Sequence, residues 1–141
     1  MKINLKECRC LMKRIFLFGE KIQIKKWNYV KKYFTENKES YIAISHDVNS
    51  SARKKVRIKL IFWFEKERHN HTTGVLTAGT YAKFEYTGSI KNYIHYINNV
   101  YMNSLPFYGL QKKNVYDLEI IHKDKDDSYR FEYYLPICNK T

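Results

Sequence analysis

The chain has 141 residues, the length of one ordinary domain, and we interpret residues 1–141 as a single folding unit. Hydrophobic residues make up 44% and charged residues 28%, with 5 Gly and 2 Pro, a composition that excludes a disordered or collagen-like chain. No run approaches the roughly 20 apolar residues that a membrane-spanning helix needs. Charged residues interrupt the first eleven positions, which argues against a signal peptide.

The three cysteines, Cys8, Cys10 and Cys138, are too few and odd in number for a disulfide framework. We therefore expect a cytoplasmic protein with free thiols. Cys8 and Cys10 would share one side of a strand, but no second cysteine pair completes a tetrahedral metal site. His69 and His71 lack a third ligand at a recognisable spacing, so we predict neither a metal nor a cofactor.

The net charge of +12 lies almost entirely in the first half of the chain. Residues 1–70 carry 18 Lys and Arg against 7 Asp and Glu, whereas residues 71–141 carry 8 against 7. A basic segment interleaved with Trp27, Tyr29 and Tyr33 raises nucleic-acid binding as an alternative function. The lysines alternate around a predicted helix, however, and a solvated helix face accounts for them, so nucleic acid is not the expected partner.

The first half predicts a strand, a helix and a hairpin of two strands. Residues 11–18 form an extended apolar stretch, and over residues 20–36 apolar side chains then recur at intervals of three and four. Residues 41–45 and 56–65 are strand-forming runs on either side of the turn-rich residues 47–51. The predicted buried face of the helix comprises Ile24, Trp27, Val30 and Phe34.

The second half repeats this order of elements. Residues 75–86 are extended, Gly88 is expected to make a turn, and Ser89 is a suitable N-cap for a second helix. Two further strands are predicted at residues 115–122 and 129–137, separated by a charged turn. The predicted face of the second helix comprises Ile90, Ile94, Ile97, Tyr101 and Leu105.

The repeated order predicts an α+β fold built from two strand-helix-strand-strand modules, about residues 1–67 and 75–138. Each module would contribute an antiparallel sheet with one main helix, and a pseudo-twofold axis would relate the two. Trp63 and Tyr134 would then occupy equivalent positions in the closing strands of the modules. Pairing the two sheets would leave a concave seam lined by aromatic residues, and such seams are common ligand sites.

Residues 76–137 resemble the effector-binding domain shared by gyrase-inhibitor-like (GyrI-like) proteins and by the sensor halves of multidrug-responsive AraC- and MerR-type regulators. Thr77 and Ser104 depart from the family pattern, which has Pro and Trp there. The resemblance implies two modules with pseudo-twofold symmetry and a cleft that binds bulky, often cationic, aromatic compounds. It is carried, in family order, by Leu76-Thr77-Ala78-Gly79-Thr80-Tyr81-Ala82, Ser104-Leu105-Pro106 with Gly109, Leu118-Glu119-Ile120, and Tyr134-Leu135-Pro136-Ile137.

Glu119 is the leading candidate for a ligand-binding residue. Side chains alternate along a strand, so its carboxylate points away from Leu118 and Ile120 and makes one face polar at this point. An unpaired carboxylate in apolar surroundings is costly to ionise, which makes it a selector for a hydrophobic cation. The resemblance implies a cation-reading Glu on this strand. Asp117 is the alternative if the strand register is shifted, and an exposed Glu on an edge face is the plain alternative.

Trp63 and Tyr134 are the candidate walls of the site. If the closing strands flank the seam, the two rings would face each other and sandwich a planar ligand by stacking and cation–π contact. Ile121 shares the face of Glu119 and is a weaker wall candidate. Ordinary core packing is the alternative for both aromatic residues, because most of the 13 Tyr, 8 Phe and 2 Trp must serve packing.

The leading function is a stand-alone small-molecule-binding protein that sequesters or senses bulky, aromatic, cationic compounds. No Ser/His/Asp arrangement or glycine-rich phosphate loop is visible, so we assign no catalytic residue, although the resemblance also includes hydrolases of reactive small molecules. A regulator or DNA gyrase as protein partner is a further implication of the resemblance. We expect a hydrophobic or cationic small molecule as the ligand and no membrane partner.

Overall fold

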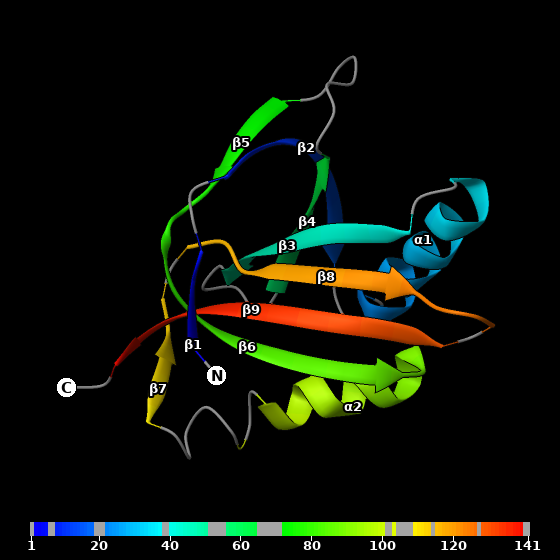
Figure 1. Ribbon diagram of the computed structural model, residues 1–141. Coiled ribbons are helices and arrows are strands. Elements are labelled where there is room, and N and C mark those ends of the chain that lie inside the picture. Colours follow the sequence, from blue (N-terminus) through cyan, green and yellow to red (C-terminus); the bar gives the residue numbers. More distant parts are fainter. Residues whose placement is uncertain are drawn as a thin grey trace.

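Figure 1 shows the computed structural model, which describes residues 2–5, 8–18, 22–37, 40–50, 56–64, 72–100, 103, 109–113, 115–126 and 128–139. Over these residues the chain forms two α-helices, α1 (Ile22–Glu36) and α2 (Ile90–Asn99). The strands of the first half are β1 (Lys2–Leu5), β2 (Cys8–Phe18), β3 (Tyr41–Ser50) and β4 (Val56–Phe64). Those that follow are β5 (Thr72–Leu76), β6 (Gly79–Gly88), β7 (Leu110–Lys112), β8 (Leu118–Lys123) and β9 (Tyr129–Asn139).

The strands pair antiparallel in the order β1-β6-β9-β8-β3-β4-β2-β5, with β7 added beside β9. The two halves of the chain meet at the β3–β8 pair, where Ile42 lies opposite Ile121 and Ile44 opposite Glu119. From the seam outward, the first half places β3, then the closing strand β4, then β2, which precedes α1; the second half places β8, then the closing strand β9, then β6, which precedes α2. The predicted α+β class is therefore confirmed.

Both helices pack on the same face of the sheet (Figure 1). The alternation of side chains along the strands gives this face an apolar surface, to which β3 contributes Ile44, β4 Phe62 and β9 Phe131. Trp27 of α1 and Tyr93 of α2 meet edge to face over it, with their ring centroids 5.8 Å apart. The main hydrophobic core therefore lies between the two helices and the centre of the sheet.

The opposite face of the sheet carries a separate, smaller cluster. Ile61 and Trp63 of β4 and Leu76 of β5 are buried there, with Tyr116 and Leu118 packed against them. Neighbouring residues of one strand point to opposite faces of the sheet, so Ile61 and Trp63 lie on the face opposite to Leu60 and Phe62.

The predicted face of the first helix is correct for Trp27, Val30 and Phe34, which are buried, and wrong for Ile24, whose exposed fraction is 64%. At 100° per residue, Ile24 lies roughly 120° around the helix from Val30, outside the arc that contacts the sheet. The buried residue near this end of α1 is instead Lys26.

The second helix begins as predicted. The hydroxyl of Ser89 accepts a hydrogen bond from the backbone N–H of Asn92 at 3.2 Å, which caps the first turn. Ile90 is buried, and Ile94 and Ile97 pack partly buried against the core. Tyr93, which was not predicted, is the most deeply buried side chain of this helix. Tyr101 and Leu105 lie outside the described residues.

The predicted turn at residues 47–51 is wrong for its first part, because β3 continues to Ser50. Asp47 lies opposite Lys59 and Asn49 opposite Arg57 in a regular antiparallel ladder with β4. Long-range pairing thus outweighs the local turn preference of these residues. The extended stretch predicted at residues 75–86 is in fact divided between β5 and β6, and the short strands β1 and β7 were not predicted.

Candidate functional site

Glu119 lies on β8 at the centre of the sheet and points to the face that the helices cover. Its cross-strand neighbours on that face are Ile44 of β3 and Tyr133 of β9. The residue is 1% exposed, so the carboxylate is removed from bulk water. A carboxylate at such a position must be paired or hydrogen-bonded to remain ionised at an acceptable cost.

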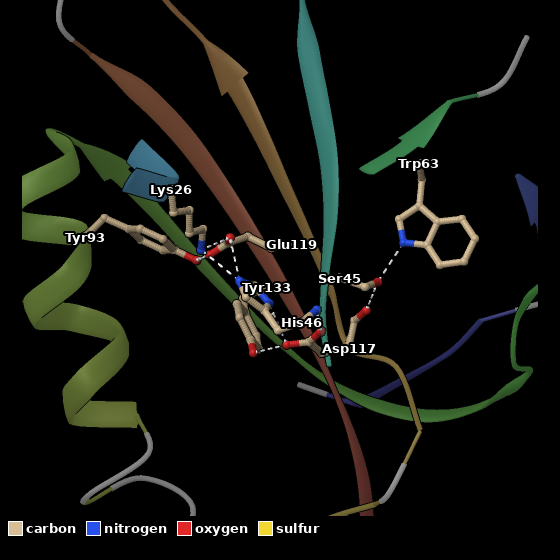
Figure 2. A network of polar contacts seen from close by, with 8 residues as sticks. All are labelled: Lys26, Ser45, His46, Trp63, Tyr93, Asp117, Glu119 and Tyr133. Atoms are coloured by element: carbon tan, nitrogen blue, oxygen red, sulfur yellow. Dashed lines mark hydrogen bonds and ion pairs between the residues drawn. The ribbon is translucent and has the colours of Figure 1, made fainter. Parts of the chain in front are cut away.

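Both helices supply a partner for this carboxylate (Figure 2). The ammonium of Lys26, from α1, donates to Glu119 Oε1 at 2.6 Å, and only 6% of the Lys26 side chain is exposed. The hydroxyl of Tyr93, from α2, donates to Oε2 at 2.5 Å. Each oxygen is therefore held by a different helix, and Glu119 links α1, α2 and the sheet.

A second carboxylate, that of Asp117, extends the network along the same face. The backbone N–H of His46 donates to Asp117 Oδ1 at 2.7 Å, and His46 Nδ1 lies 3.0 Å from Oδ2. The hydroxyl of Tyr133 donates to the same Oδ2. His46 Nε2 lies 2.9 Å from the ammonium of Lys26 and 3.7 Å from Glu119, so the imidazole joins the two carboxylates into one cluster.

The electrostatics of Asp117 follow from these contacts. Burial by itself raises the pKa of its carboxyl, but the neighbouring imidazole of His46 and the hydrogen bonds from His46 and Tyr133 outweigh burial, and the pKa lies below its ordinary value. Among the described residues, no buried side-chain nitrogen or oxygen lacks a hydrogen-bond partner. The cluster is thus a satisfied polar network inside an otherwise aromatic core.

Asp117, the alternative considered for a shifted strand register, and Glu119 both lie on the helix-covered face, and both are buried. Asp117 faces His46 and Tyr133, whereas Glu119 faces Lys26 and Tyr93. Ile121 also lies on this face and is buried in the core, as the alternation along the strand predicted.

Trp63 and Tyr134 do not join Glu119, and the predicted arrangement of one carboxylate between these two rings is wrong. Trp63 lies opposite Ala43, and Tyr134 lies opposite Leu118. Residues that are directly opposite share a face, and Leu118 points away from Glu119. Both rings therefore lie on the far side of the sheet. They are also not adjacent there, since β3 and β8 separate their strands.

The two rings have other neighbours on that face. Trp63 donates its indole N–H to the hydroxyl of Ser45 at 2.7 Å, and that hydroxyl donates to the backbone carbonyl of Asp117 (Figure 2). Tyr134 lies under the ammonium of Lys83, 5.6 Å from the ring centroid. Lys83 in turn pairs with Glu132 at 3.3 Å. These contacts fix the orientation of both rings, and Ser45 connects Trp63 indirectly to the buried network.

Sequence reasoning missed Lys26, His46, Tyr93 and Tyr133 as members of the site. Lys26 belongs to a lysine-rich helix in which Lys25 is exposed, and no local pattern separates the two. The available signal was indirect. A buried carboxylate on β8 is stabilised by a nearby cation, and α1 is rich in lysine.

Over the described residues, no group of three or more His, Cys, Asp and Glu side chains is placed to hold a metal ion. In the same part of the chain, neither helix has the length and apolarity needed to cross a membrane.

The chain thus combines an open antiparallel sheet, two helices over one face and a buried carboxylate between them. A model of the GyrI-like small molecule binding domain matches residues 11–137. The match covers most of the chain, and the chain belongs to this family.

Relatives of known structure share the fold over nearly the whole chain. SAV2435, solved bound to tetraphenylphosphonium, has a TM-score of 0.70 at 12% identity, over 98% of this chain and 93% of that one. EcmrR, solved in a complex with DNA, has a TM-score of 0.64 at 14% identity, over 99% of this chain and 57% of that one. At these identities the likeness shows the fold.

A curated relative in sequence is the F1 operon positive regulatory protein of Yersinia pestis. It is 32% identical over 79 residues, which are 56% of this chain and 26% of the regulator. The matched segment therefore spans about a quarter of that protein's length.

Proposed function

We propose that the protein binds a bulky aromatic cation between α1 and α2, over the centre of the sheet, with Glu119 supplying the charge. The observation that carries this proposal is a buried carboxylate held from both helices, by Lys26 at 2.6 Å and by Tyr93 at 2.5 Å. Sequestering or sensing such compounds is the role that fits a domain of this family. The bulky cation bound by SAV2435, tetraphenylphosphonium, supports the ligand class.

The surroundings of the carboxylate suit such a ligand. Trp27 lies edge to face against both Tyr93 and Phe131, with centroid distances of 5.8 and 6.0 Å, and Tyr93 stacks on Phe131 at 3.8 Å. Ring faces and a carboxylate together favour an aromatic cation, because the rings replace its hydration and the carboxylate balances its charge. Ile121 supplies an apolar wall beside Glu119 in this proposal.

Replacing Glu119 by Gln tests the proposal, since the amide keeps the shape and removes the charge. A charge pair near 4 Å is worth roughly 4 kcal/mol at an effective dielectric of about 20. After desolvation we expect a net loss of about 1–3 kcal/mol, a 5- to 150-fold weaker affinity. The measurement is a fluorescence titration with the cationic dye rhodamine 6G. An uncharged dye of the same ring system should lose little.

Two control variants sharpen this titration. Glu36→Gln removes a carboxylate at the exposed end of α1, and it should leave dye affinity unchanged. Trp63→Ala tests the far face of the sheet, and it should change dye affinity less than twofold if the ligand binds on the helix-covered face. An unaltered affinity in Glu119→Gln together with a large loss in Trp63→Ala would move the site to the far face and refute the proposal.

We also propose that the two halves are a structural duplication related by a pseudo-twofold axis at the β3–β8 seam. The equivalent strand order on the two sides of the seam supports this proposal. An experimental structure tests it: the Cα atoms of β2, α1, β3 and β4 should superpose on those of β6, α2, β8 and β9 in one rigid rotation of about 180°. A rotation far from 180° would contradict it.

A further inference from the structure

We propose that Lys26 is the specificity-determining residue of this site: its ammonium occupies the position of the ligand's positive charge, and a cation binds by exchanging with it. This inference rests on the proposed function and adds the rule by which the site selects its ligand.

The contacts of the Lys26 ammonium are those that a bound aromatic cation would make. Besides the ion pair with Glu119 at 2.6 Å, Nζ lies 4.4 Å from the ring centroid of Trp27, within cation–π distance. It also lies 2.9 Å from Nε2 of His46. A carboxylate, a ring face and an imidazole nitrogen are thus already arranged around one positive charge, and Figure 2 shows the carboxylate and the imidazole of this set.

The burial of Lys26 is unusual for its residue type and for its helix. Lysine is almost never fully buried unless it is paired, and Lys25, Lys31 and Lys32 on the same helix are exposed. The helix also leaves Ile24 in solvent. A well-packed apolar residue at position 26, with an apolar partner at position 119, would hold the helix at least as well, because desolvation of a buried ion pair offsets much of its attraction. The pair is therefore better explained by ligand recognition than by stability.

Exchange follows from the charge balance of the site. Glu119 can be neutralised by Lys26 or by a ligand, and a second cation beside an ammonium that stays in place would be repelled. The lysine side chain is long and flexible, so its ammonium can move to solvent when a cation takes its place. A ligand must then offer more ring and apolar contact than the lysine it displaces. Small hydrated cations do not meet this condition, whereas bulky aromatic cations do.

Amine acylation measures the exchange in the unaltered protein. Acetylation with an N-hydroxysuccinimide ester, read by mass spectrometry, should label Lys26 slowly in the free protein and at least fivefold faster when tetraphenylphosphonium saturates the site. Lys25, exposed one residue away, is the internal control and should be labelled at the same rate in both states. Equal or slower labelling of Lys26 in the saturated protein would overturn the exchange.

Substitution provides the second test. Lys26→Met keeps the length of the side chain and removes the competing charge, so its affinity for tetraphenylphosphonium should rise at least tenfold. Lys25→Met makes the same change of net charge at an exposed position, and it should stay within twofold of the unaltered protein. Lys26→Arg keeps the tethered charge and should not gain affinity.

The outcomes separate this inference from the proposed function. A cation that binds the unaltered protein and Lys26→Met equally well supports the ligand class and refutes the exchange. If the cation binds neither the unaltered protein nor Lys26→Met, both the proposed ligand class and the exchange are refuted. Lys26→Met could be unfolded in the absence of ligand, because Glu119 has lost its partner. In that case tetraphenylphosphonium should restore the circular dichroism spectrum of the folded protein. A failure to restore it also counts against the exchange. The double variant Lys26→Met with Glu119→Gln should fold without ligand and gain no affinity.

Discussion

At the scale of single residues, the proposed site contains two buried carboxylates with different partners. Glu119 is held by groups from the two helices, whereas Asp117 is held by β3 and β9 through His46 and Tyr133. We interpret Glu119 as the ligand-binding group and Asp117 as the group that positions His46 beside it. The two carboxylates should therefore respond differently to substitution.

Asp117 should make the folding stability depend on acid pH. Its pKa in the folded protein lies below the ordinary value of 3.8, so its contribution is complete above about pH 5 and is lost as the pH falls through the folded pKa. We expect Asp117→Asn to unfold about 2–4 kcal/mol more easily at pH 7, since it breaks a buried polar network. Urea unfolding between pH 3 and pH 7 measures this effect, and the variant should lose less stability on acidification than the unaltered protein.

A variant as stable as the unaltered protein at pH 7, with the same pH dependence, would show that Asp117 does not contribute in this way. The affinity of folded Asp117→Asn for rhodamine 6G should remain closer to that of the unaltered protein than the affinity of Glu119→Gln does, because the Coulomb contact with the ligand is assigned to Glu119.

At the scale of elements, α1 and α2 cover the face of the sheet on which we propose that the ligand binds. They meet through Trp27 and Tyr93, and each contributes one partner to Glu119. The N-cap of α2 at Ser89 fixes where this helix begins and hence where Tyr93 points. In the proposed binding mode, a ligand that enters between the helices must therefore disturb the aromatic contact as well as the ion pair.

The orientation of α1 predicts a contrast between two of its apolar residues. Val30 is fully buried and Ile24 is exposed. Val30→Ala should lower the free energy of unfolding by about 2 kcal/mol through lost burial and a residual cavity. Ile24→Ala should change it by less than about 0.5 kcal/mol. Urea unfolding measures both, and equal losses would mean that the helix is rotated from the orientation described here.

At the scale of the whole molecule, the buried polar cluster at the proposed site forms because the two halves of the chain are joined at the β3–β8 seam. Lys26 and His46 belong to the first half, and Tyr93, Glu119 and Tyr133 to the second. Neither half alone contains both the carboxylate and its cation. The excess of positive charge lies in the first half, which supplies Lys26. This lysine is buried and pairs with Glu119.

The remaining positive charge is expected to be a solvated surface. Lys25, Lys31 and Lys32 are exposed on α1, and Lys32 pairs weakly with Glu36 at 3.8 Å. We therefore expect duplex DNA to bind the protein weakly, in the range of about 10⁻⁴–10⁻⁶ M typical of non-specific binding, near physiological salt. Fluorescence anisotropy at two salt concentrations measures this. Tight, strongly salt-dependent binding would favour the nucleic-acid alternative.

The sequence by itself determined most of the local structure and the face of the sheet on which Glu119 lies relative to its strand neighbours. Periodicity identified both helices and the main strands, short motifs between Leu76 and Ile137 carried the family resemblance, and alternation along β8 placed Glu119 and Ile121 on one face. These features depend on neighbours within a few positions, so they can be recognised from one chain.

Only the tertiary structure decided which residues share a face with Glu119. Alternation shows which residues of one strand point together, but the relation between two strands depends on their pairing register, and a shift by one residue exchanges the faces. The registers of β4 with β3 and of β9 with β8 place Trp63 and Tyr134 on the far side. The partner of Glu119 was equally hidden, because the rotation of α1, and not its sequence of lysines, turns Lys26 inward and leaves Lys25 in solvent.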